Sequence, residues 1–372
     1  MGFFKKFGAV VLAAVLLMNI GGCTNKKSKV VSVNGESMSG AMYVYQLMQQ
    51  KASYLSENSL TETEDMWDGE YDDEYTLGEY IQTLVLDNMI NTLVWRTQFD
   101  KLGLSFTEAE QKEIDDAISK AEEAAGGKDA LQKTLDQYDL NYDEYIQSVY
   151  YDTQKIYKIV DYYYGENGLE PVDEKTLLSY FKENYVRAKH ILISTLDSEG
   201  AAMTGSAMTK AKQTAQSVYE KAKGADEKTF DELIKQYNED EGVASYPDGY
   251  LFTTGEMVEE FEEAAFDMAV GETRMIQSDY GFHIIRKLSL EDEKVYTAQV
   301  RHQMLLQLKA TELTAMVKEW REAAKIKIGR GVLSKYTCKS VESVSGTNTS
   351  DGTTAQEIAD KLGLTDEDLV EK

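Results

Sequence analysis

The sequence predicts an α+β protein in which a small domain of strands and helices is inserted into a larger helical region. Apolar residues recur at helical spacing through much of the first half of the chain, and again near its end. Between these parts, about a hundred residues alternate short strands with short helices, the pattern of a compact α+β domain. Only two prolines, Pro171 and Pro247, interrupt the chain, which favours long helices.

The first residues have the three parts of a secretory signal. Two lysines precede an apolar stretch at residues 9–18, and small residues follow before Cys23. The stretch is too short for a permanent membrane helix, so we expect residues 1–22 to be a cleaved signal peptide. The Ile-Gly-Gly-Cys ending resembles a bacterial lipobox, which implies lipidation of Cys23 and a place on the extracytoplasmic face of the cell membrane. The alternative is an ordinary signal cleaved near Gly22, which leaves a free cysteine.

The composition limits the partners. There are 65 acidic residues against 39 basic ones, a formal net charge of −26 at pH 7, which argues against nucleic acid as a partner. The same charge repels anionic headgroups and favours a body held off the membrane by a tether at residues 23–29, although solubility alone explains it equally well. Cys338 is the second of two cysteines, so acylation of Cys23 leaves no internal disulfide.

The helical region is expected over residues 30–184. It opens with a short strand, and the segment up to residue 184 then shows several turn and helix signals. In chain order these are a turn at Asn34-Gly35, a helix end at Leu102-Gly103, capping boxes at Thr107/Glu110 and Asn141/Glu144, and a tyrosine-rich helix over residues 145–164 that closes at Gly165.

An acidic segment at residues 62–74 could be a calcium site, because Asp65, Asp68, Asp72 and Asp73 lie close together. Their spacing does not follow the EF-hand order of ligands. A solvated loop is the preferred interpretation, and we expect no metal or other cofactor.

The inserted α+β domain is expected over residues 185–290. It begins with a strand at residues 188–193, and a helix ends near Lys223. The later elements are a helix opened by a capping box at Thr229/Glu232, a strand at 250–252, a helix at 257–268, and two strands at 273–278 and 281–288 joined by a tight turn.

The last part of the chain is expected to return to the helical region. A single long helix over residues 296–324, within a segment 291–339, has one apolar side that must be buried. Residues 340–372 are rich in Ser, Thr and Gly and then acidic, which predicts a flexible tail with at most a weak helix near residues 355–362.

Two of the three histidines lie in apolar strands at opposite ends of the inserted domain. His190 and His283 each follow a similar local pattern, and Asp240, Met257 and Phe261 lie between them in sequence. A single histidine in a strand is usually a core residue whose hydrogen bonds are all made within the protein. Two that bracket the same domain instead suggest a shared polar site.

Five motifs look, in order and spacing, like the parvulin family of peptidyl-prolyl isomerases. They are Lys189-His190-Ile191-Leu192, Phe230-x-x-Leu233 running to Asp240, Gly255-Glu256-Met257-Val258-x-x-Phe261, Gly271-Glu272 and Tyr280-Gly281-Phe282-His283-Ile284-Ile285. With the lipobox and the flanking helices, the chain up to about residue 339 resembles PrsA-type lipoprotein foldases. The resemblance implies a helical chaperone-like domain with an inserted parvulin-like domain.

The resemblance also implies roles for particular residues. Met257 and Phe261 would line a pocket for proline, and four residues would form the polar network behind it: His190, Asp240, Ser278 and His283. The third histidine, His302, is expected on the polar side of the last helix.

One turn departs from the family pattern. Where the family has Gly-Gly-Asp-Leu-Gly, this chain has Tyr246-Pro247-Asp248-Gly249-Tyr250, so Gly249 replaces the pocket leucine. The pocket is then wider, or is rebuilt by Tyr250 or Phe252.

Three functions are compatible with these observations. The first is a membrane-anchored foldase that binds unfolded exported proteins and isomerises X-Pro bonds. The second is a holdase chaperone with an inactive parvulin domain. The third, a solute-binding lipoprotein, would need two α/β lobes, and the long helices on either side of one small domain argue against it. The helical region could also dimerise.

Overall fold

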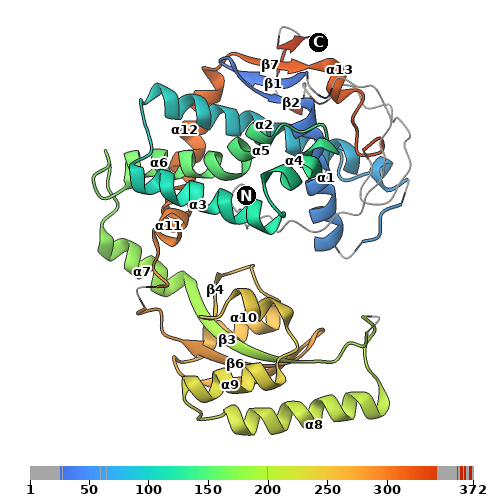
Figure 1. Ribbon diagram of the computed structural model, residues 1–372, viewed down its shortest axis with the longest axis vertical. Helices are drawn as coiled ribbons and strands as arrows, with labels where there is room; N and C mark the ends of the chain where they lie inside the picture. Colours follow the sequence, from blue (N-terminus) through green and yellow to red (C-terminus); the bar gives the residue numbers. More distant parts are fainter. Residues whose placement is uncertain are drawn as a thin grey trace. The chain divides into compact units, whose positions relative to one another are not determined.

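The computed structural model describes residues 26, 28–58, 60–63, 65–198, 200–292, 294–341, 358, 361–362, 364–365 and 368–370. The expected signal peptide, Cys23 and most of the tail lie outside these residues. The described chain forms two compact units, one from residues up to Leu169 and from Lys309 onward, the other from Glu170 to Leu308 (Figure 1). Among the helices described, none is both long and apolar enough to cross a bilayer.

The first unit, called here the helical unit, is mostly α-helix with one small sheet. Its elements are β1 Lys29–Val33, β2 Glu36–Ser39, α1 Gly40–Glu57, η1 Met66–Asp68, α2 Leu77–Lys101, α3 Glu108–Ala124, α4 Lys128–Asp136, α5 Tyr142–Ile146, the π-helix η2 Gln147–Tyr151, α6 Asp152–Tyr164, α12 Ala310–Glu322, β7 Ile326–Gly329, α13 Arg330–Leu333 and β8 Leu369–Val370.

The sheet of the helical unit joins the two ends of the chain. Its strand order is β2-β1-β7-β8, with β1 antiparallel to both β2 and β7 (Figure 1). The hairpin between β1 and β2 turns at Asn34 and Gly35, whose φ angles are 52° and 106°, which confirms the predicted turn. The predicted flexible tail needs correction at the few positions that the structure describes, because β8 pairs with β7 and Ile358 lies in the hydrophobic core.

Helix α2 is the central helix of this unit. Thr76 and Glu79 form a complete capping box at its start. The helix ends at Lys101, and Gly103 follows with a φ of 64°, as the sequence predicts. The side chains that it buries in the core include Ile81, Val85, Leu86, Met89, Ile90 and Leu93.

The capping boxes predicted further along have different outcomes. Thr107 and Glu110 form a complete box at the start of α3. Asn141 accepts bonds from two backbone N–H groups of α5, but the carboxylate of Glu144 turns away from it. That carboxylate accepts from the N–H and the hydroxyl of Ser39, each at 2.7 Å, and so holds the residue that caps α1. The Asn141 box is therefore only half formed.

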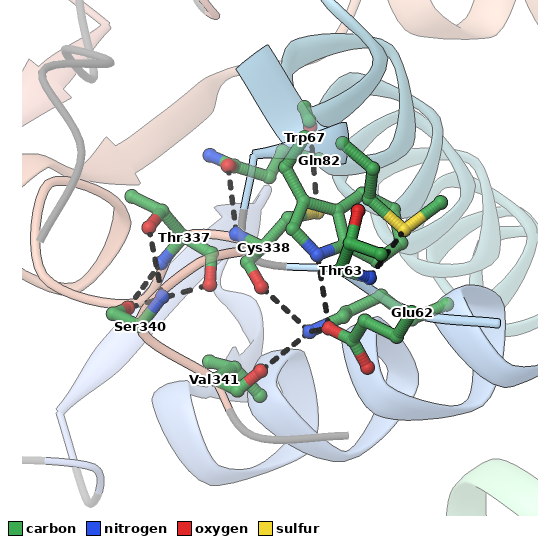
Figure 2. A network of polar contacts seen from close by, with 11 residues as sticks. Glu62, Thr63, Trp67, Gln82, Thr337, Cys338, Ser340 and Val341 are labelled. Carbon is green, nitrogen blue, oxygen red and sulfur yellow. Dashed lines mark hydrogen bonds and ion pairs between the residues drawn. The ribbon is translucent and has the colours of Figure 1, made fainter. Parts of the chain in front are cut away.

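The acidic segment is not simply a solvated loop. Trp67 within it is only 2% exposed, and its indole N–H donates to Glu62 at 2.9 Å. Glu62 also pairs with the ammonium of Lys51 at 2.9 Å, and Lys51 is fully buried. The same ammonium donates to the carbonyl oxygens of Cys338 and Val341 at 2.6 Å each, so the segment, α1 and the chain after α13 meet at one charged group (Figure 2).

The single long helix predicted near the end is interrupted at Lys309. The backbone there has φ −107° and ψ 17°, and α12 begins at the next residue. The helix before the break, α11 Ala298–Leu308, packs against α7 Glu174–Asn184 within the second unit, whereas α12 packs on α2, with Trp320 edge-on to Trp95 at 5.2 Å. The predicted return to the helical region thus holds for α12 only, because the two halves bury their apolar sides in different units.

The second unit, called here the inserted unit, is an antiparallel sheet covered on both faces. Its strand order is β4-β3-β6-β5, with α8 and α9 on one face and α10 on the other (Figure 1). The elements besides α7 and α11 are β3 Tyr185–Ser194, α8 Gly205–Ala222, α9 Glu227–Tyr237, η3 Glu241–Ser245, β4 Tyr250–Thr253, α10 Glu259–Asp267, β5 Thr273–Ser278 and β6 Gly281–Leu288.

Alternation along the strands divides the interior of this unit into two cores. Ile191 and Ile284 face α8 and α9, while Ala188 and Ile285 face α10. The capping box predicted for α9 is wrong: Asp226 caps the helix by accepting from the N–H of Thr229 at 2.8 Å. Aspartate is as strong an N-cap as serine or threonine, and α9 therefore begins earlier than predicted.

Candidate active site

The pairing of β3 with β6 brings the two strand histidines together. His190 lies opposite Ile285 and His283 lies opposite Leu192, so both imidazoles stand on the face that α10 covers. The ring centroids are 5.4 Å apart and the ring planes differ by 11°. Both rings are largely buried.

A continuous chain of hydrogen bonds runs through these rings. Nε2 of His190 is 2.8 Å from Oδ2 of Asp240, and its Nδ1 is 3.2 Å from Nδ1 of His283. Nε2 of His283 is in turn 2.8 Å from the hydroxyl of Ser278, which accepts a bond from the N–H of Tyr280 at 3.2 Å. The structure therefore brings all four polar residues of the sequence hypothesis into one network.

The ionised carboxylate sets the direction of this chain. Asp240 can only accept, so Nε2 of His190 carries the proton in that bond. With both rings neutral, Nδ1–H of His283 then donates to His190, and the Ser278 hydroxyl donates to His283. Hydrogen bonds from His190, and then from Tyr250 and Gly242, hold the pKa of the Asp240 carboxyl well below its usual range.

Burial keeps the second ring neutral. Desolvation, reinforced by the neighbouring His190, lowers the pKa of His283 to about 4. At neutral pH this imidazole is therefore uncharged, and its two nitrogens can serve as one donor and one acceptor.

Asp240 is positioned by a short segment that extends the edge of β3. The N–H of Glu239 donates to the carbonyl of Leu192 at 3.0 Å, and the side-chain oxygen of Asn238 accepts from the N–H of Leu192 at 2.9 Å. The amide of Asn238 also donates to the backbone carbonyl of Asp240 at 2.7 Å, and Oδ1 of Asp240 accepts from the N–H of Gly242 at 2.9 Å. These bonds aim the carboxylate at His190.

The apolar residues predicted for the pocket lie beside the imidazoles at different depths. Phe261 is 3% exposed and presents its ring edge-on to His190 at 5.2 Å and to His283 at 5.6 Å. Met257 is partly buried against the same core. Phe252 is 1% exposed, and its ring lies 5.8 Å from that of Phe261, so both rings belong to the buried core beside the imidazoles.

Tyr250 is the residue whose polar role the sequence hypothesis did not include. Its hydroxyl donates to Oδ2 of Asp240 at 2.8 Å, and its ring is edge-on to His190 at 5.5 Å. Burial and the nearby carboxylate raise the pKa of Tyr250 above its ordinary value. The feature of the sequence that pointed to this role was the altered turn at residues 246–250, which places Tyr250 next to Gly249.

Gly249 explains why no leucine occupies this turn. Its φ is 94°, and a side chain there would begin 3.0 Å from the carbonyl oxygen of Ala188 and 3.1 Å from Leu288. The turn therefore does not supply the pocket wall that the family pattern has, and the tyrosine beside it contacts the network instead.

The site combines buried apolar side chains with a chain of hydrogen bonds. Within the part of the chain that the structure describes, no group of three or more His, Cys, Asp or Glu side chains could hold a metal ion. What the site offers is a water-poor apolar surface beside a preorganised chain of donors and acceptors.

Two families match this chain in consecutive parts. The family described as PPIC-type PPIASE domain matches residues 174–289, and the family described as SurA-like N-terminal domain matches residues 3–144. The fold and the site thus define a parvulin-type peptidyl-prolyl cis-trans isomerase domain inserted into a SurA-like helical domain.

Individual relatives share the name of one foldase. The foldase protein PrsA of Caldanaerobacter subterraneus subsp. tengcongensis is 25% identical over 347 residues, which cover 87% of this chain and 98% of that protein. The PrsA of Geobacillus kaustophilus is 35% identical over 148 residues, 38% of this chain and less than half, 45%, of that protein. A crystal structure of PrsA from Streptococcus pneumoniae aligns at 18% identity and a TM-score of 0.38, over 82% of this chain and 97% of that one. The two family models and these curated relatives together support a PrsA-type parvulin foldase.

Proposed function

We propose that this foldase binds unfolded exported proteins and isomerises their X-Pro bonds at the site formed by His190, His283, Asp240 and Ser278. Phe261 and Met257 hold the proline ring in this proposal. The observation that carries it is the buried hydrogen-bond chain through two nearly parallel imidazoles, directly beside the Phe261 ring.

The reaction needs no covalent partner. An X-Pro bond turns over a barrier of about 18–20 kcal/mol because the amide must lose its resonance. An apolar surface that grips the proline and excludes water destabilises the polar planar amide relative to its less polar twisted form. The hydrogen-bond chain keeps the side chains beside the proline in one arrangement, so they need not reorganise while the bond turns.

The network suits this task because its protons are already placed. The Asp240 carboxylate stays charged and the His283 ring stays neutral across the physiological pH range. Tyr250 and Gly242 add donors to Asp240, which limits its movement.

The test is a proline-limited refolding reaction, which otherwise takes tens of seconds. We expect the wild-type protein to accelerate it, and His190→Ala, Asp240→Ala and Met257→Ala each to reduce kcat/KM by about tenfold or more. His190→Ala and Asp240→Ala break the hydrogen-bond chain, and loss of one preorganised polar group costs about 10²–10³ in favourable cases. Met257→Ala removes apolar contact area, which is worth about 10–200-fold in a hydrophobic pocket. His302→Ala, a histidine of α11 outside the network, is the matched control and should keep full activity.

Two outcomes would count against this assignment. If all three variants refold the client as fast as wild type does, the network is not the catalytic site. If neither wild type nor the variants accelerate refolding but all suppress client aggregation, the protein is a holdase whose parvulin fold serves binding.

We also propose a lipid anchor at Cys23, on the extracytoplasmic face of the membrane. The motif Ile20-Gly21-Gly22-Cys23 after an apolar stretch supports it. Labelling of growing cells with a radioactive fatty acid should mark the wild-type protein and not Cys23→Ser. An unlabelled wild-type protein that remains in the soluble fraction would refute the anchor.

A further inference from the structure

A cavity of about 340 Å³ lies in the inserted unit on the side of His190 where Tyr250 packs. It is lined by β3, by α9 and by the segment from η3 to the start of β4. Neither Met257 nor Phe261 lines it, so the cavity lies apart from the two side chains proposed to hold the proline ring. His190 and Tyr250 are shared between the cavity and the hydrogen-bond network.

The cavity occupies a gap along the edge of β3. The last residue pair between β3 and β4 is Ala188 with Tyr250. The next residue of β3 that is bonded along the same edge is Leu192. Its backbone contacts Asn238 and Glu239, which follow α9. His190 lies between these two points, and the gap beside it is the cavity.

The walls of the cavity are mostly apolar and aromatic. The rings of Tyr246 and Tyr250 lie 4.7 Å apart at 36°, and Pro247, Val243 and Ile234 complete this surface. Tyr246 is one of the most exposed large side chains of the unit, although it stands on this wall. Paired tyrosines with a proline form a surface that suits another aromatic ring.

The charges around the cavity nearly balance. Lys189 is bonded to Asp231 at 2.7 Å and to Glu227 at 3.2 Å, and Lys235 is the second cation of the lining. Two cations therefore stand near three carboxylates, those of Asp231, of Glu227 and of Asp240, which is bonded to His190 and Tyr250. A charged ligand gains little here, and shape and apolar area decide what binds.

The size and position limit the occupant further. Pockets for small molecules begin at about 300 Å³, so this cavity holds one large side chain rather than an extended ligand. The His190 ring is 5.2 Å from Phe261 on one side and 5.5 Å from Tyr250 on the other. An extended peptide advances about 3.3 Å per residue, so it spans the distance from Phe261, past His190, to Tyr250 within about three residues.

We propose that this cavity binds one aromatic side chain of the client polypeptide, within three residues of the substrate proline. The proposal rests on the isomerase site proposed above and adds a preference for aromatic neighbours to it. The tyrosines that form the wall occur where this chain departs from the family's turn pattern, so the preference is a property of this chain's own residues.

The test uses alanine peptides with one proline and a single phenylalanine, placed in turn at each position from three before to three after the proline. In the full-length mature protein we expect one position to raise kcat/KM about tenfold over the all-alanine peptide, the lower end of what filling a hydrophobic pocket contributes. Ala244→Phe, which fills the cavity from its lining, should bring this ratio close to one. Ala269→Phe, an exposed alanine elsewhere in the unit, should leave the ratio at the wild-type value.

A second variant, Tyr246→Ala, and a second measurement, peptide affinity, test the cavity independently of Ala244→Phe. Tyr246→Ala removes part of the wall without filling the cavity and should also lower the ratio. If no position exceeds the all-alanine peptide by more than twofold, or if the ratio survives both variants, the cavity is not a subsite. If no peptide is isomerised at all, the proposed function fails, and the same peptides' relative affinities for wild type and Ala244→Phe then decide about the cavity alone.

Discussion

Replacement of Lys51 by methionine should unfold the helical unit far more easily, because this lysine is a buried charge with every donor in use. Its ammonium donates to two carbonyl oxygens at 2.6 Å and pairs with Glu62 at 2.9 Å, and it lies 4.8 Å from the centre of the Trp67 ring (Figure 2). Methionine fills a similar volume but leaves all three acceptors without this partner.

The expected cost follows from those contacts. A hydrogen bond to a charged group contributes about 1.5–3 kcal/mol, and removal of one partner of a buried ion pair costs about 3–5 kcal/mol. Since Glu62 keeps the bond from Trp67 and is partly exposed, we expect Lys51→Met to lower the free energy of unfolding by about 4 kcal/mol. Glu62→Gln should cost less, and the double variant less than the sum of the two, because no unpaired carboxylate is left.

Urea denaturation followed by tryptophan fluorescence measures this directly. All three tryptophans, Trp67, Trp95 and Trp320, lie in the helical unit, so the signal reports on that unit alone. Lys112→Met is the matched control, because Lys112 is exposed and pairs only with Asp116 on the same helix; its urea midpoint should stay at the wild-type value. A Lys51→Met midpoint indistinguishable from that control would refute the reasoning.

Three further predictions follow from single contacts. The folded pKa of His283, about 4, lies below its ordinary value of 6.5, so the unfolded chain takes up this proton first. The stability of the inserted unit is complete above pH 6.5 and should fall by about 3 kcal/mol as the pH drops to 4, and His283→Gln should flatten this slope. Because all three tryptophans lie in the helical unit, these urea melts are followed by circular dichroism. Tyr250→Phe removes one donor from Asp240 and should lower kcat/KM several-fold in the refolding assay, while the urea midpoint followed by circular dichroism changes little; unchanged activity would exclude a role for this hydroxyl. Glu144→Ala frees the N-cap residue Ser39 and should cost about 1–2 kcal/mol of unfolding free energy, with Glu144→Asp as a shorter acceptor that recovers part of it.

Features governed by short stretches of chain were predictable from the sequence. The bounds of β5 and β6 coincide with the predicted strands, since alternation and a tight turn define both ends. The hairpin at Asn34-Gly35 and the end of α2 at Gly103 follow from residues that favour positive φ. Strand alternation also places His190 and His283 on one face once β3 and β6 are neighbours.

Features that depend on contacts across long distances in the chain were not predictable in this way. Lys51 and Cys338 are separated by 287 residues, and nothing near either one indicates a buried charge. The helix break at Lys309 has no glycine or proline to mark it; it lies where the chain passes from one unit to the other. The bond from Tyr250 to Asp240 could be inferred only after the turn between them was known.

The register of β6 against β3 links the fold of the inserted unit to its chemistry. Gly281 pairs with Ser194 at the end of both strands, two residues before His283. Its φ is 150°, and a side chain there would begin 2.3 Å from the carbonyl oxygen of Ile193, so no other residue fits this close approach. A slip of one residue would turn His283 to the face that α8 and α9 cover, away from His190 and Ser278. The glycine of the turn therefore fixes the register, and the register in turn creates the hydrogen-bond chain on which the proposed catalysis depends.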